Sequence, residues 1–115
     1  MKKTFLTLFF IIFLASFAFA AGPLEKCFKT YNSNSEDVYL KAFTSLSVNK
    51  YEVLEIQSDS GYILFKANGK DYLLTVVPNG NGSLVKVMPT DTDFSKGFIV
   101  EENVFKMLDS VLIKP

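Results

Sequence analysis

The sequence predicts a two-layer α+β fold, in which a four-stranded antiparallel meander sheet carries an N-terminal and a C-terminal helix on one face. Three observations indicate this fold: an apolar stripe of helical period at 36–48, short β-rich runs separated by Gly-containing turns at 51–88, and a second helical stripe at 101–112. Because short loops join consecutive strands and the helices stand at the two ends, we expect the order α-β-β-β-β-α.

Both helices are predicted from their apolar spacing and their charged first turns. Ser33 and Ser35 are alternative N-caps for the first helix, and Glu36 and Asp37 place negative charge at the positive end of its dipole. Asn49 is its expected end. The predicted buried stripes are Tyr39, Ala42, Phe43 and Leu46 in the first helix, and Val104, Met107, Leu108 and Val111 in the second.

The pair Asn68-Gly69 is the strongest turn signal in the chain, because both central residues of a type I′ hairpin need positive φ. A two-residue loop at this place sets Ile63 opposite Leu74 on one face of the sheet and Leu64 opposite Leu73 on the other. The first strand is expected at 51–57, Pro78 is expected to end the third, and the fourth is expected at 83–88 after the turn at 79–82.

This register leaves apolar side chains on both faces of the sheet. The expected core face consists of Leu54, Ile56, Ile63, Phe65, Tyr72, Leu74, Val76, Val85 and Val87. The expected opposite face carries Tyr51, Val53, Tyr62, Leu64, Leu73, Leu84 and Met88, diluted by charged residues. An apolar stripe centred on Leu64, Leu73 and Leu84 predicts a docking surface for a protein partner or a second copy. Alternatively, it is an ordinary sheet exterior, or the segment from Leu24 to Phe28 covers it.

The first twenty residues are predicted to be a signal peptide. Lys2 and Lys3 precede an apolar run at 5–14, and Ala18-Phe19-Ala20 places small residues where a signal peptidase cleaves. We therefore expect an exported protein, periplasmic or secreted, with no transmembrane segment after cleavage; an uncleaved N-terminal anchor is the alternative. The remainder is expected to comprise a flexible segment at 21–35 and one domain at 36–115.

Composition after cleavage argues against several function classes. Ten Lys and twelve Asp or Glu remain, which gives a side-chain charge of −2, and the whole chain contains no Arg, His or Trp. Without a guanidinium group to contact phosphates and guanine edges, we do not expect nucleic-acid binding. Without His, neither a Ser-His nor a Cys-His pair can form, so we expect no enzyme and no cofactor. Cys27 lacks the small neutral neighbours of a lipobox, which leaves an ordinary exported thiol or an intermolecular disulfide.

One loop has part of a calcium-binding pattern. Asp91, Asp93 and Ser95 stand at the first, third and fifth positions of a twelve-residue loop that ends at Glu102. Lys96 occupies the position where the sharp turn requires Gly, so a solvated acidic loop is the favoured interpretation.

The segment "KYEVLEIQSDSGYILFKANGKDYLLTVV", with its "SGYI" and "NGKDY" motifs, resembles the centre of small bacterial envelope domains of helix-grip type. Among these are the repeated domains of the outer-membrane assembly lipoprotein called component C, and uncharacterised exported α-β-β-β-β-α families are equally similar. The resemblance spans residues 36–112 and implies a scaffolding or accessory module.

Two other resemblances imply a protease inhibitor. Residues 48–87 resemble a PepSY-type domain, and the Gln57 and Gly61 spacing resembles the first inhibitory hairpin of cystatins. Asp59 replaces the central apolar residue of that hairpin. The first function expected is thus a non-enzymatic, exported interaction module that uses Tyr62, Leu64, Leu73, Leu84 and Met88. The alternative is a periplasmic or secreted inhibitor that acts through hairpin loops at Gln57, Asp59, Gly61 and Asn81.

Overall fold

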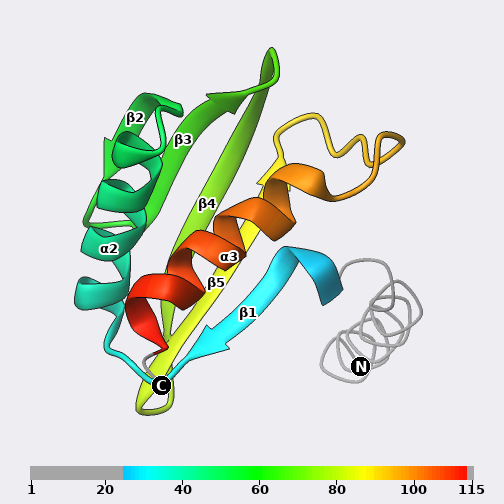
Figure 1. Cartoon of the computed structure of the whole chain (residues 1–115). Coiled ribbons are helices and arrows are strands. Elements are labelled where there is room, and N and C mark those ends of the chain that lie inside the picture. Colours follow the sequence, from blue (N-terminus) through cyan, green and yellow to red (C-terminus); the bar gives the residue numbers. More distant parts are fainter. Residues whose placement is uncertain (1–24, 114–115) are drawn as a thin grey trace, which may run out of the picture.

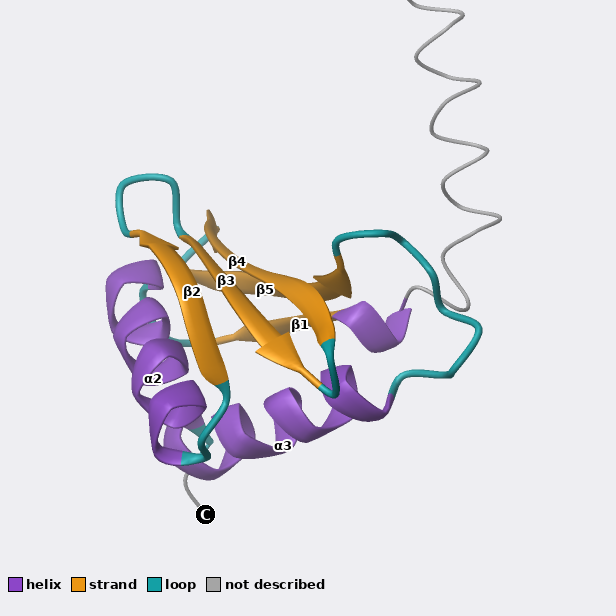
Figure 2. Cartoon of the chain, turned by 90° about the horizontal axis from the view of Figure 1, so that it is seen from above, coloured by secondary structure: helices purple, strands orange, loops and turns teal. Residues whose placement is uncertain are grey.

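The computed structural model describes residues 25–113, so the predicted signal peptide lies outside the described residues. It contains a five-stranded antiparallel sheet in the order β1-β5-β4-β3-β2, with two long helices on one face (Figures 1 and 2). The elements are η1 (Glu25–Cys27), β1 (Phe28–Tyr31), α2 (Ser35–Val48), β2 (Glu52–Gln57), β3 (Tyr62–Ala67), β4 (Lys70–Asn79), β5 (Gly82–Pro89) and α3 (Ile99–Leu112). The predicted α+β class is confirmed, but the expected number of strands was one too few.

The additional strand is β1, and it lies in the segment that we expected to be flexible. It pairs antiparallel with β5 and forms one edge of the sheet. Lys29 Nζ lies 2.6 Å from Asp109 Oδ2, and the Tyr31 hydroxyl donates to Asp109 Oδ1 at 2.9 Å. Four residues without clear alternation give almost no strand signal, so the pairing of β1 with β5 and its attachment to α3 decide its conformation.

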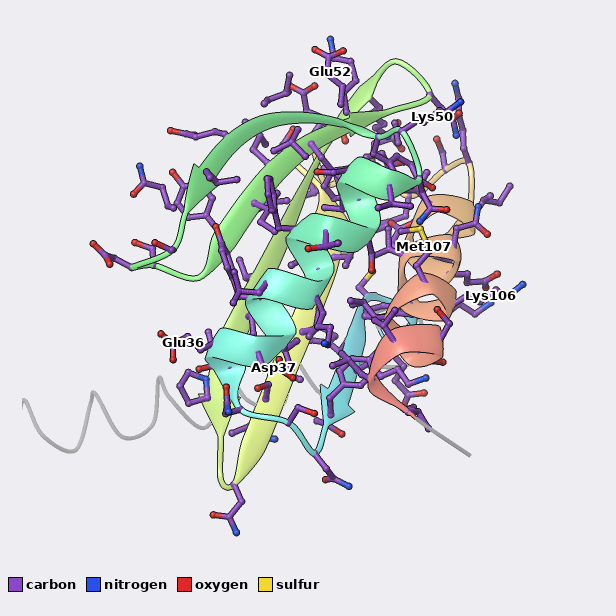
Figure 3. The ribbon with its side chains drawn as sticks, turned by 60° about the vertical axis from the view of Figure 1, so that its left-hand side comes forward. Glu36, Asp37, Lys50, Glu52, Lys106 and Met107 are labelled. Atoms are coloured by element: carbon purple, nitrogen blue, oxygen red, sulfur yellow. The ribbon has the colours of Figure 1, made fainter. Side chains whose placement is uncertain are left out.

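The N-cap of helix α2 lies one residue from each of the two predicted caps. The N-cap is Asn34, whose side-chain oxygen accepts a hydrogen bond from the Asp37 N–H at 2.8 Å. Glu36 and Asp37 stand in the first turn, as Figure 3 shows, and Asn49 caps the other end. An Asn cap bonded to the third helical residue satisfies one of the free N–H groups of the first turn.

The β3–β4 hairpin has the predicted register. Asn68 and Gly69 have φ values of 54° and 76°, as a type I′ turn requires, and Ala67 pairs with Lys70. The pairs Ile63↔Leu74 and Leu64↔Leu73 follow from that turn. Local turn chemistry therefore determines which side chains of these two strands face inward.

Strand β4 continues past Pro78, where we expected it to end. Pro78 pairs with Ser83 of β5, and a two-residue loop follows the pair Asn79↔Gly82. On its other side, this part of β4 is no longer paired with β3. The Val76 N–H still donates a hydrogen bond to the carbonyl of Gly61, the residue before β3, at 2.7 Å. The missing N–H of Pro78 costs little, because this part of β4 is an open edge.

Strand β2 corrects the predicted assignment of faces. Val53 pairs with Phe65, but an irregularity shifts the register so that Glu55 pairs with Leu64. Val53 and Tyr51 consequently pack against the core, and Leu54, at the irregularity, is 41% exposed. Ile56 pairs with the buried Ile63 and so shares the predicted core face, but it is 50% exposed because β2 is an edge strand. A β-bulge adds one residue to a strand and reverses the alternation beyond it, and simple alternation does not reveal it.

The core lies between the sheet and the two helices. It combines the predicted inward residues of β3, β4 and β5 with one side of each helix, and Met107 lies on the side of α3 toward α2 (Figure 3). Its fully buried large side chains include Leu46, Ile63, Phe65, Leu74 and Leu108. Burying such side chains contributes about 1.5–3 kcal/mol each, so this layer supplies most of the fold's stability.

Candidate protein-interaction surface

The outer face is the face of the sheet opposite α2 and α3, and its apolar side chains stand in rows across the strands. The first row is Leu64, Leu73 and Met88, which are direct neighbours on β3, β4 and β5. The second row is Tyr62, Thr75, Lys86 and Phe28. The third row is Val77, Leu84 and Thr30. Residues directly opposite in antiparallel strands lie about 4.5–5.5 Å apart, so each row is continuous.

The rows change the shape of the predicted stripe. Leu73 pairs with Met88, whereas Leu84 pairs with Val77 four residues further along β4. At about 3.4 Å per residue, Leu84 therefore lies about 13 Å from the first row. All five predicted partner-binding residues face outward, but they are spread over the three rows: Leu64, Leu73 and Met88 in the first, Tyr62 in the second and Leu84 in the third.

Within residues 25–113, the other elements leave the outer face uncovered. Figures 1 and 2 show both helices on the opposite side of the sheet. The predicted patch residues are partly exposed, and Val77 beside them is 42% exposed. Of the segment from Leu24 to Phe28, residues 25–28 do not cover this face: η1 packs against α3, and β1 extends the sheet so that Phe28 joins the second row. Leu24 lies outside the described residues.

Sequence reasoning missed two contributors, Phe28 and Val77. Val77 continues the alternation of Leu73 and Thr75 along β4. Because Pro78 was expected to end the strand directly after it, Val77 was not assigned to the outer face. Phe28 could be assigned only once β1 was known to pair with β5.

The alternative inhibitor residues lie near one end of the sheet. Gln57 ends β2, Asp59 is exposed in the following turn, and Gly61 closes that turn with its N–H bonded to the Gln57 carbonyl at 2.8 Å. Asn81 belongs to the two-residue loop between β4 and β5. A cleft of about 420 Å³ adjoins the first turn and is lined by residues from α2, the β2–β3 turn and the end of β4, including Leu40, Asp59 and Val77.

The calcium-type arrangement is not assembled. Lys70 Nζ lies 3.3 Å from Asp91 Oδ1 and 3.7 Å from Asp93 Oδ2, while Glu102 pairs with Lys26. Asp93 accepts a hydrogen bond from the Ser95 N–H at 3.0 Å, and this bond, together with Lys70, lowers the pKa of Asp93. Within residues 25–113, no three His, Cys, Asp or Glu side chains are arranged to hold a metal ion. The acidic loop is instead an ion-paired turn.

Cys27 and Glu101 are buried beside the start of α3. Burial first, and then the charge of Glu101, raises the pKa of Cys27 to about 11, although Lys86 opposes this shift. At neutral pH Cys27 is therefore a protonated, enclosed thiol, which favours an unpaired thiol over an intermolecular disulfide. Glu101 is 1% exposed, and its Oε1 has no hydrogen-bond partner. Burial raises the pKa of this carboxyl, despite opposing effects from its backbone N–H and from Lys70.

No family model matches this chain, and no curated protein matches its sequence.

Within residues 25–113, every helix falls short of the length and apolar character that crossing a membrane requires.

Proposed function

We propose that the protein is a non-enzymatic, exported accessory module of the bacterial envelope, which binds a protein partner or a second copy of itself through the outer face. The observation that carries this proposal is the first row, in which Leu64, Leu73 and Met88 stand side by side on three adjacent strands without a covering element in residues 25–113. An antiparallel sheet with one solvated face normally alternates apolar and polar residues, and here the solvated face is apolar along a whole row.

The area of the face bounds the size of the contact. Four strands about 4.8 Å apart, and rows that span about 13 Å along them, cover about 250 Å². This area is just below the range of about 300–600 Å² for the largest apolar patches that monomers usually expose. A standard interface needs about 800 Å² from each partner, so the partner would also contact the polar rim of the face.

That rim has the composition of an interface edge. Glu52 and Lys66 are neighbours at one corner, Lys66 and Asp71 are direct cross-strand neighbours, and Glu55 lies beside Leu64. Charged residues around an apolar centre are typical of non-obligate protein interfaces. The resemblance to helix-grip envelope domains, which are scaffolding or accessory modules, and the predicted signal peptide favour a role outside the cytoplasm.

The test is cross-linking and affinity capture of the tagged protein from its native envelope. Leu73→Lys places a charge in the first row and should remove the captured partner. Leu40→Lys makes the same change at a 60% exposed leucine on α2, and should leave the partner bound. Sedimentation of the purified protein tests self-association. A strict monomer whose Leu73→Lys form captures the same proteins would disprove the proposal.

A second candidate is the protease inhibitor, and one observation favours it. The β2–β3 turn and the β4–β5 loop project from the same end of the sheet, because one hairpin separates them, and the cleft of about 420 Å³ adjoins the first of them. Inhibitors commonly insert neighbouring loops into a protease cleft, but the exposed Asp59 provides no apolar anchor. The test measures inhibition of a panel of periplasmic and secreted proteases. If the protein inhibits none of them, this function is disproved.

A further inference from the structure

Lys86 lies at the centre of the outer face. Its cross-strand neighbours are Thr75 on β4 and Phe28 on β1, and its neighbours along β5 are Leu84 and Met88. The positions diagonal to it include Leu73 and Val77. The positions around Lys86 in the sheet therefore carry apolar and hydroxyl side chains.

The acidic groups of the outer face are far from this ammonium group. Glu55 is on β2, three strands from β5, and Asp71 is four residues from Thr75 on β4. Both separations are about 14 Å, which exceeds the screening length of about 8 Å at physiological salt. Within residues 25–113 Lys86 also forms no ion pair. The positive charge at the centre therefore has no ion-pair partner in the part of the chain that the structure describes.

We propose that the partner docks an amphipathic helix whose apolar stripe contains one Asp or Glu at its middle, and that this carboxylate pairs with Lys86. This inference rests on the proposed function and specifies its partner. Burying the outer face without an opposite charge would leave the Lys86 ammonium desolvated and unpaired, which is costly. The chemistry of the centre therefore selects a carboxylate.

The spacing of the rows fits a helix that lies along β4 and β5. The first and third rows are about 13 Å apart, and helical residues seven or eight positions apart are separated by about 10.5–12 Å. One apolar residue would contact Leu73 and Met88, and another would contact Val77 and Leu84. The residue four positions after the first lies between them on the same side of the helix, over Lys86.

A second copy fits the same surface less well. If two outer faces met about a twofold axis through their centres, the two Lys86 ammonium groups would face each other inside an apolar contact. Like charges in a desolvated contact are strongly unfavourable. The charge at the centre therefore favours a different protein with an acidic residue.

The experiment titrates three synthetic helical peptides into the purified mature protein by calorimetry. The peptides carry Leu one turn before and one turn after a central residue that is Glu, Gln or Lys, and are otherwise identical. We expect the Glu peptide to bind at least tenfold more tightly than the Gln peptide, the Lys peptide to bind most weakly, and the Glu preference to fall with salt.

Substitutions then assign the preference to Lys86. Lys86→Glu should reverse the order of the Glu and Lys peptides, whereas Lys106→Glu, an equal charge reversal on the exposed side of α3 (Figure 3), should preserve it. Equal binding of the Glu and Gln peptides, an unchanged order in Lys86→Glu, or no binding of any peptide would overturn the inference. If Leu73→Lys still abolishes capture of the native partner in such a case, the proposed interaction surface stands without the acidic helix.

Discussion

The buried carboxyl group of Glu101 makes the stability of the fold depend on pH. This residue is 1% exposed, with a carboxyl oxygen that has no hydrogen-bond partner, and burial raises its pKa above the ordinary value of 4.5. The folded protein therefore holds the proton more tightly than the unfolded chain does. The resulting stabilisation is complete at acid pH, below the unfolded pKa, and is lost as the pH rises through the folded pKa.

We expect Glu101→Gln to stabilise the protein at pH 8 by about 1–2 kcal/mol, because it removes a buried charge, and to make less difference at pH 4. Urea unfolding of both proteins across this range measures the effect. Glu102→Gln changes the exposed neighbour, which pairs with Lys26 at 3.6 Å, and should have little effect at either pH. A constant difference between wild type and Glu101→Gln at all pH values would show that Glu101 is not the titrating group.

The β2–β3 turn is an element whose geometry depends on one glycine. Gly61 has φ +73°, and a Cβ built on it would lie 2.3 Å from the Val76 carbonyl oxygen. The backbone of β4 passes so closely because its Val76 N–H bonds to the Gly61 carbonyl. Both the left-handed conformation and the close approach therefore require glycine here.

Gly80→Ala separates these two effects. Gly80 has φ +61° and no atom within 4 Å of its Cβ position, so alanine there should cost only the conformational strain of about 1–2 kcal/mol. Gly61→Ala should cost about 2 kcal/mol more, because the backbone of β4 must also move. Thermal or urea unfolding compares the two, and equal losses would mean that the close approach to Val76 is relieved without cost.

Strand β1 is held at the edge of the sheet by contacts with α3. Lys29 and Tyr31 both reach Asp109, and the Lys29–Asp109 pair is more than one-third exposed, so solvent screens part of its strength. Tyr31 donates to the carboxylate, and burial and Asp109 raise its pKa, which keeps the phenol protonated. The attachment therefore combines a screened ion pair with a charge-assisted hydrogen bond.

Asp109→Asn should loosen β1 selectively, with a loss of about 1–2 kcal/mol in stability. Hydrogen exchange should become faster at the β1 amides, while the amides of the β3–β4 hairpin keep their protection until global unfolding. Asp37→Asn, which weakens a 4.0 Å pair within α2, provides the comparison. Equal acceleration across all strands would show that β1 opens only together with the whole sheet.

At the scale of the whole molecule, the sheet separates a packed face from an open one. Leu73 and Leu74 are consecutive in β4, yet Leu74 is fully buried against the helices and Leu73 is partly exposed on the outer face. Because side chains alternate along a strand, Leu74 contributes to the core, whereas Leu73 is accessible on the outer face.

Leu74→Ala should destabilise the protein by about 2–5 kcal/mol, because it opens a cavity in the core. Leu73→Ala should cost about 1 kcal/mol or less, because its side chain is only partly buried. Urea unfolding of the two variants checks this difference. Similar losses would show that the outer face is packed against another part of the chain or a second copy.

Much of the fold could be predicted from local signals. The helical stripes and the charged first turns located both helices, and the Asn68-Gly69 turn set the register of β3 with β4, which placed Tyr62, Leu64 and Leu73 on the outer face. The bulge in β2, the continuation of β4 through Pro78 and the burial of Glu101 had no comparable signal. Each depends on which neighbour a strand or helix gains or lacks in space.

The sequence by itself determined the period of each main element and the reversal of the central hairpin, because these depend on interactions between residues close together in the chain. Only the tertiary structure decided that residues 28–31 form a fifth strand beside β5, and that Phe28 stands opposite Lys86. Contacts between segments more than fifty residues apart produce these features, and such contacts are established only when the whole sheet closes.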